Sequence, residues 1–194
     1  MTLILAACGG TSSAPTTTST SSIPVTVPAT TSSSTPAITA IACRNGQLAA
    51  TPFPGGAAAS NVSQVIQFVN DSSSTCTLTG YPGVAALVGA GAQVVQAKRE
   101  LSGMLGGLQD NGRTPPTVTL EPGALASATV EGGDTPAGTE TSCPSYHWFL
   151  VTPPDLTQSV KVAVGLPGSA ISGFPGCSAI RVDPVVPGGS GRLN

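Results

Sequence analysis

Short runs of alternating apolar and polar residues recur along most of the chain and predict β-strands. Alternation with a period of two places every second side chain on one face of a sheet. The runs expected to form strands are Ala37–Cys43, Asn61–Asn70, Cys76–Thr79, Val84–Val88, Gln93–Arg99, Thr117–Leu120, Ala124–Val130, Ser145–Thr152, Val160–Val164 and Ile180–Val182. No segment shows helical apolar spacing of useful length. The pattern therefore predicts an all-β protein, an antiparallel β-sandwich that is immunoglobulin-like or related.

Turn residues separate these runs. Gly80-Tyr81-Pro82-Gly83 joins two of the expected strands, and Glu121-Pro122-Gly123 joins two others as a hairpin. Two longer stretches are expected to be loops, residues 44–60, which contain Pro52, Pro54, Gly55 and Gly56, and residues 101–112.

The first forty residues have a different composition. Residues 11–39 contain only Ser, Thr, Pro, Ala, Val and Ile, without a charge or an aromatic ring. Such a segment cannot bury enough apolar surface to offset the entropy lost on ordering. We expect residues 9–39 to be a disordered spacer, residues 40–188 to be one β-sandwich domain, and residues 189–194 to be a C-terminal tail.

The few residues before the spacer resemble a lipid-attachment signal. Leu5-Ala6-Ala7-Cys8 matches a bacterial lipobox, in which the cysteine sulfur receives a diacylglyceryl group. A complete export signal also needs a basic start and a longer apolar core. Residues 1–8 are therefore interpreted as the remnant of a lipoprotein signal peptide, and Cys8 as a membrane anchor. The alternative is a chance tetrapeptide in a cytosolic protein. If Cys8 is the anchor, the spacer is a stalk, which is either O-mannosylated or an unmodified disordered linker.

The charge of the chain excludes one class of partner. Charged residues make up only 8% of the sequence and the net charge is −2. Lys98 and Arg99 are the only basic neighbours of note. Because nucleic-acid binding needs a basic face several residues wide, no nucleic-acid partner is expected.

Four cysteines remain after Cys8. An even number at wide spacing in an exported chain indicates two disulfides, for which three pairings exist. Cys43–Cys76 and Cys143–Cys177 are favoured, because each closes a loop of similar length within one half of the domain. A zinc site is disfavoured, because the cysteines form no close pair and the chain has a single histidine.

Catalytic patterns are absent from the sequence. A structural role for His147 is favoured over that of a general base, and Gly103–Gly107 lacks the Lys-Ser/Thr pair of a phosphate-binding loop. The acids lie in turns or at strand ends and form no close motif. We expect no catalytic residue, cofactor or metal. Tyr81 and Tyr146 are candidates for contact with a glycan or protein, although packing over the end of the sandwich is the commoner role for such residues.

Several of these segments together resemble a known family. They are Gln67-Phe68-Val69-Asn70, Cys76–Val84, Leu120-Glu121-Pro122-Gly123, Cys143, Leu150–Pro154, Cys177 and Pro184–Gly188. In this order they are similar to a secreted actinobacterial domain, the domain of unknown function 4232, common in mycobacterial and streptomycete lipoproteins. The resemblance implies export, an all-β fold and disulfides, but it supplies no activity.

The expected function is accordingly that of a non-enzymatic binding or structural module. Such a module would be anchored through Cys8 outside the cytoplasmic membrane and would bind an envelope glycan, protein or small ligand. The alternative is an envelope hydrolase or transferase that uses carboxylates from separate loops.

Overall fold

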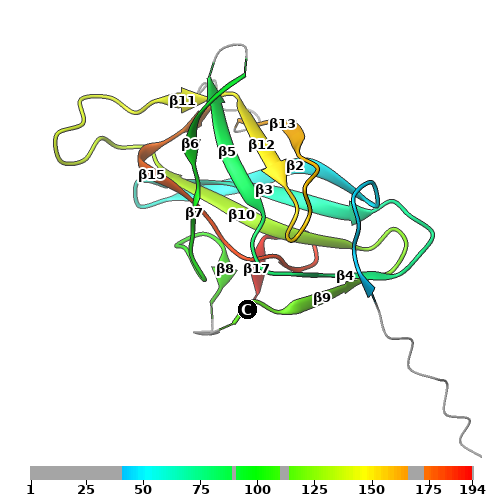
Figure 1. The fold of residues 1–194 in the computed structure, drawn as a ribbon. Coiled ribbons are helices and arrows are strands. Elements are labelled where there is room, and N and C mark those ends of the chain that lie inside the picture. The colour runs from blue at the N-terminus through cyan, green and yellow to red at the C-terminus, as the bar shows by residue number, and fades with distance from the viewer. Residues whose placement is uncertain (1–40, 89–90, 110–113, 166–172, 194) are drawn as a thin grey trace, which may run out of the picture. The chain divides into compact units, whose positions relative to one another are not determined.

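The computed structural model describes residues 41–88, 91–109, 114–165 and 173–193 (Figure 1). They lie in the second of the two units into which the chain divides, Ile38–Asn194. Every element that they form is a β-strand, as the alternating pattern predicted. Among these residues no helix is long and apolar enough to cross a membrane.

The strands are short, and most end at a turn residue. In chain order they are β1 (Ile41–Ala42), β2 (Leu48–Ala58), β3 (Asn61–Asn70), β4 (Cys76–Thr79), β5 (Gly83–Val88), β6 (Ala92–Gln96), β7 (Lys98–Arg99), β8 (Gly107–Leu108), β9 (Thr117–Leu120), β10 (Leu125–Gly133), β11 (Ser145–Tyr146), β12 (Trp148–Thr152), β13 (Val160–Ala163), β14 (Phe174–Pro175), β15 (Cys177–Val182), β16 (Val186–Pro187) and β17 (Arg192–Leu193).

Two sheets form the body of the domain. The large sheet has the order β2-β3-β10-β15-β7, and β16 pairs with β10 beyond the end of β15. The second sheet has the order β13-β12-β5-β6, and all its pairs are antiparallel. A three-stranded sheet, β1-β4-β9, and the pairs β11-β14 and β17-β8 complete the structure.

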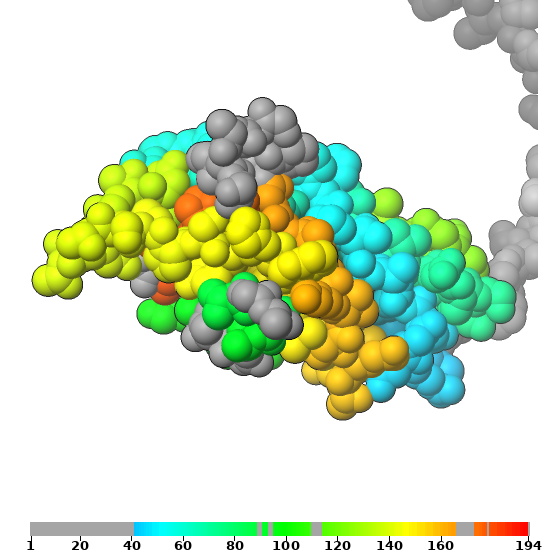
Figure 2. Space-filling view, turned by 90° about the horizontal axis from the view of Figure 1, so that it is seen from above, coloured from blue at the N-terminus to red at the C-terminus, as the bar shows by residue number. Residues whose placement is uncertain are grey.

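The apolar core lies between the two main sheets, whose strands cross one another in Figure 1. Alternate residues of each strand face it, as a period of two requires. The large sheet contributes Val62, Ile66, Phe68, Ala126, Ala128, Val130, Ile180 and Val182, and the second sheet contributes Val84, Ala86, Phe149, Val151 and Val162. Phe149 and Phe174 pack edge to face with their ring centroids 5.2 Å apart. At one side of the core β2 lies beside β13 (Figure 2).

The longest strand, β2, contradicts the expectation of a loop over residues 44–60. Pro52 and Pro54 lie within it, opposite Ile66 and Gln64 of β3. Proline is tolerated there because β2 is an edge strand, which needs no N–H donors on its outer side. The pairing register shifts between Pro54 and Ala57, so the glycines between them mark a bulge.

The expected loop at residues 101–112 and the expected C-terminal tail also contain strands. Gly107 and Leu108 form β8, which pairs in parallel with Arg192 and Leu193 of β17. Two other predicted strands are divided. Residues 93–99 split between β6 and β7, and the run at 145–152 is interrupted at His147.

The two disulfides join Cys43 to Cys76 and Cys143 to Cys177, which is the pairing favoured from loop length. Cys43 follows β1, and Cys76 is the first residue of β4. The second bridge ties the segment before β11 to the start of β15. Each bridge therefore fixes a short, weakly paired segment to a longer strand.

Removing either disulfide should lower stability by a similar amount. The two bridges span 33 and 34 residues, and loop entropy of that size corresponds to roughly 3–4 kcal/mol. Urea denaturation of the Cys43→Ala/Cys76→Ala and Cys143→Ala/Cys177→Ala variants measures both losses. A loss of less than about 1 kcal/mol for either pair would contradict the loop-entropy account.

Candidate functional site

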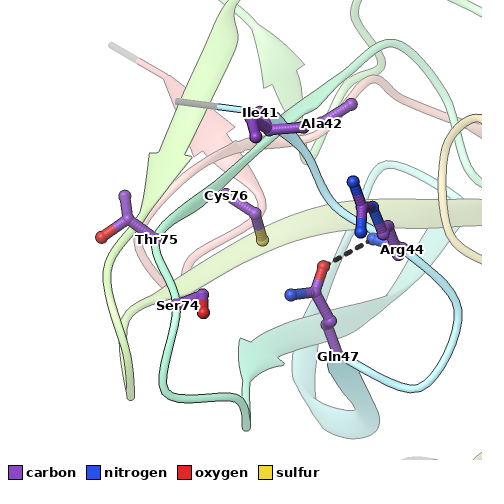
Figure 3. A pocket seen from close by; sticks show the side chains of 7 residues that line it. All are labelled: Ile41, Ala42, Arg44, Gln47, Ser74, Thr75 and Cys76. Carbon is purple, nitrogen blue, oxygen red and sulfur yellow. Dashed lines mark hydrogen bonds between the residues drawn. The ribbon is translucent and has the colours of Figure 1, made fainter. Parts of the chain in front are cut away.

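A small pocket opens beside the Cys43–Cys76 disulfide (Figure 3). Its volume is about 160 Å³, which is below the range of roughly 300–1,000 Å³ typical of sites that enclose a whole small molecule. The lining residues are Ile41, Ala42, Arg44, Gln47, Ser74, Thr75 and Cys76. We call this site the Arg44 pocket. Its size suits one end group of a larger ligand.

One wall of the Arg44 pocket is a tight turn after β1. Residues 44–47 close it, with the Gln47 amide donating to the Arg44 carbonyl at 3.1 Å and the Arg44 amide donating to Gln47 Oε1 at 2.7 Å. Gly46 occupies the turn with a φ of +83°, a conformation that glycine adopts without steric cost. The backbone of Arg44 and the side chain of Gln47 are thus held at the pocket by local hydrogen bonds.

The other wall depends on Asn70, which is fully buried at the end of β3. Its amide donates to the carbonyls of Ser74 and Leu120 at 2.8 and 2.9 Å. Its Oδ1 accepts hydrogen bonds from the amide and the hydroxyl of Ser72. Gln47 Nε2 in turn donates to Ser72 Oγ at 3.3 Å. A satisfied buried network of this kind keeps both walls in place.

Arg44 gives the pocket its chemical character. Its guanidinium lies at the pocket in Figure 3, and no hydrogen bond or ion pair joins it to another of the described residues. A guanidinium presents five N–H donors in a planar fork that matches a carboxylate or a phosphate. The pocket is therefore suited to an anionic group.

A second polar cluster lies on the outer face of the large sheet, where side chains alternate with those of the core. Glu131 of β10 is 1% exposed, and its carboxylate accepts hydrogen bonds from the amides of Met104 and Leu105 at 3.0 and 2.7 Å. Arg181 of β15 lies 3.8 Å from Glu131 and 3.5 Å from Glu100. Asp183, also 1% exposed, completes the cluster.

Two glycine-rich segments cover this face, residues 101–108 (the first strap) and residues 188–193 (the second strap). Ser127 Oγ donates to the Gly188 carbonyl at 2.7 Å and accepts from the Gly191 amide at 2.8 Å. Thr129 Oγ1 donates to the Gly191 carbonyl at 2.8 Å. The straps are therefore held to β10 by hydrogen bonds between its side chains and their backbone.

The first strap contains the glycine run that was compared with a phosphate-binding loop. Its backbone amides do bind an anion, in the manner of a backbone nest, but the anion is the carboxylate of Glu131. A Cβ at Gly103 would lie 2.1 Å from Glu131 Oε1. Only glycine fits so close an approach.

The two predicted contact residues, Tyr81 and Tyr146, do not line the Arg44 pocket. Tyr81 is half-buried, and its pKa is raised by burial and then by the charge of Asp183. Tyr146 is only 3% exposed, and burial raises its pKa, so it packs in the core and offers no contact surface.

His147 is exposed between β11 and β12. Within the described ranges, no group of three or more His, Cys, Asp or Glu residues could hold a metal ion. Cys8 lies outside those ranges.

Sequence reasoning missed the Arg44 pocket and the buried acidic cluster. A turn with Arg and Gln three residues apart carries no motif by itself. One feature of the sequence could have indicated the buried acidic cluster. Ser127, Thr129 and Glu131 form a polar row on a strand whose other face is apolar, and glycine-rich segments lie elsewhere in the chain. The sequence alone does not show that those segments fold onto that row.

Adding one methyl group to the first strap should destabilise the domain. In Gly106→Ala the new Cβ would lie 2.2 Å from Thr129 Oγ1 and 2.3 Å from Thr129 Cβ. Overpacking of this kind costs roughly 1–3 kcal/mol, measurable by urea denaturation. Gly56→Ala is the matched control, because its Cβ would meet only Leu105 Cδ2 at 3.9 Å. Equal effects of the two substitutions would show that the close approach to Thr129 is unimportant.

Comparisons with curated proteins and with solved structures gave no match. A family model matches residues 43–185, a range that begins at Cys43, the first cysteine of the bridge beside the Arg44 pocket, and ends after the buried Asp183. It includes both disulfides and the first strap. Because the match covers most of the chain, the protein belongs to the family described as a domain of unknown function, DUF4232.

Proposed function

We propose that this protein is a non-enzymatic binding module of the cell envelope, in which the Arg44 pocket receives an anionic group of a glycan or protein. The two disulfides support an oxidising, extracytoplasmic setting. The resemblance to secreted actinobacterial lipoproteins supports the same setting. It also suggests that the protein comes from an actinobacterium.

The observation that carries the proposal is the Arg44 guanidinium, which lies at the pocket without an acceptor among the residues that the structure describes. The pocket walls are fixed before a ligand arrives, by the Cys43–Cys76 bridge and by the hydrogen bonds of Asn70. A preformed site loses little conformational entropy on binding. A carboxylate or a phosphate at the end of a polymer fits both the volume and the charge.

The alternative, a hydrolase or transferase that uses loop carboxylates, needs two acids open to a substrate. Glu131 and Asp183 do lie in one cluster, but each is 1% exposed and the first strap covers them. A buried pair of this kind is better explained as structural. This arrangement supports the binding proposal over the enzymatic one.

Anchoring through Cys8 is the second part of the proposal. A lipidated cysteine followed by residues 9–39 would place a tether directly before β1, the strand that forms one edge of the Arg44 pocket. Several acyl chains, at roughly 0.8 kcal/mol per buried methylene, would hold the protein on a membrane.

Replacing Arg44 should weaken anion binding at the pocket. In an NMR titration with inorganic phosphate or acetate, the amides of Gln47, Ser74 and Thr75 should shift in the wild-type domain and not in Arg44→Gln. Charged hydrogen bonds are worth roughly 1.5–3 kcal/mol, so affinity should fall about tenfold or more. Lys98→Gln, which removes one positive charge from exposed β7, should bind as the wild type does.

The same two variants test the physiological partner. Cross-linking and pull-down from intact cells with the lipidated protein should recover an envelope polymer or protein, with much less recovered by Arg44→Gln than by Lys98→Gln. Equal recovery by the two variants would contradict a role for the pocket. No recovery by any of them would contradict the binding function.

The anchor is tested by mass spectrometry of the N-terminal peptide. A full-length gene expressed in an actinobacterial host should yield membrane-bound protein whose Cys8 carries a diacylglyceryl group. The control is Cys8→Ala, which should be released from the membrane fraction. An unmodified Cys8 thiol in membrane-associated wild-type protein would overturn the assignment.

A further inference from the structure

Asp183 has an environment that the binding function does not explain. Its side chain is 1% exposed, and neither carboxyl oxygen has a hydrogen-bond partner among the described residues. The backbone of the first strap lies directly over it, since a Cβ at Gly107 would be 2.9 Å from Asp183 Cγ. Buried carboxylates in proteins are normally paired or hydrogen-bonded, so this group is an exception.

The surrounding charges make ionisation of Asp183 more costly still. Glu131 faces it from β10, and Glu100 from the segment after β7. The one opposing charge acting on it is that of Arg181, which already contacts both of those acids. Burial first, and then these two carboxylates, raise the pKa of Asp183 to about 8, against the effect of Arg181. Tyr81 also faces Asp183, and Arg99 lies close to Tyr81.

The straps above Asp183 are attached as one unit. Gly107 donates its amide to the Gly191 carbonyl at 2.9 Å, and Gln109 donates to the Leu193 carbonyl at 3.0 Å. Arg192 Nη2 of the second strap also reaches the Met104 carbonyl of the first at 3.4 Å. Movement of the first strap therefore breaks the β8-β17 pairing and loosens the second. Other attachments are hydrogen bonds between the straps and the side chains of Ser127, Thr129 and Glu131 of β10 and of Gln67 of β3. Leu108 is the buried apolar side chain of the first strap.

We propose that Asp183 is a proton-dependent latch for the two straps. While Asp183 carries its proton, the straps lie closed on the outer face of the large sheet. When the proton is lost, the uncompensated charge beneath Gly107 drives the straps away from that face. Opening lets water solvate Asp183 and exposes the polar row of Ser127, Thr129 and Glu131. The inference concerns conformation and does not depend on the proposed ligand.

The direction of the pH effect follows from the two states. In the open state a solvated aspartate has an ordinary pKa near roughly 4, whereas in the closed state the pKa of Asp183 is about 8. Opening therefore releases one proton between these values. The equilibrium constant for opening should rise about tenfold per pH unit over that range and level off at higher pH. The straps are most firmly closed in acid.

Hydrogen exchange measured from pH 5 to pH 9 tests the latch directly in the wild-type protein. After correction for the intrinsic exchange rate, protection of the Leu105, Gly107 and Gly191 amides should fall about tenfold per pH unit up to pH 8. These amides should also exchange faster than the ladder amides of β3 and β10. In Asp183→Asn the slope should disappear, whereas Asp155→Asn, which removes an exposed carboxyl, should keep the wild-type slope.

Three results would overturn the proposal. The first is strap protection that does not change with pH. The second is strap amides that exchange only as fast as those of β3 and β10, because this means that the straps open only when the whole domain unfolds. The third is an unchanged slope in Asp183→Asn. If Asp183→Asn does not fold, the comparison of strap and ladder amides in the wild-type protein still decides between a latch and global unfolding.

Discussion

The structure depends on β10, a central strand that is buried on both faces. One face is apolar and the other is polar. One face contributes Ala126, Ala128 and Val130 to the apolar core. The other presents Ser127, Thr129 and Glu131, whose polar atoms must find partners because they are shut off from water. Those partners are backbone groups of the two straps. The requirement to satisfy buried polar atoms therefore adds a layer to the sandwich that apolar burial alone would not provide.

The same requirement organises the Arg44 pocket. Asn70 ends β3 with a side chain that has no access to solvent, and its four hydrogen bonds fix the segment from Ser72 to Ser74. The disulfide at Cys43 then sets the opposite wall. Asp183 departs from this requirement, since neither of its carboxyl oxygens has a hydrogen-bond partner within the described part of the chain. Asn70 thus keeps one site rigid, whereas Asp183 makes another sensitive to its protonation state.

Much of the fold could be predicted from alternation, because β3, β4, β9 and β10 each place one apolar face on the core. The favoured disulfides followed from spacing. Alternation could not show that Pro52 and Pro54 lie in a strand, because proline fits a strand at an edge or a bulge, and edge position is a property of the whole sheet. Nor could it place the straps, which are held by side chains far away in sequence. Tyr146 was a candidate for surface contact because the sequence does not reveal that its ring is covered in the core.

The Cys43–Cys76 bridge has a mechanical consequence. A force applied through the residues before Ile41 would first load β1, which has only two paired positions, Ile41 with Cys76 and Ala42 with Thr77. Beyond them the load reaches a covalent bond to β4, which itself pairs with β9 over four residues. Beyond β1, the force would thus be carried into β4 by the disulfide bond and not by backbone hydrogen bonds that break one after another. A domain pulled from its N-terminal end would therefore lose the two paired positions of β1 before the disulfide passes the load to β4.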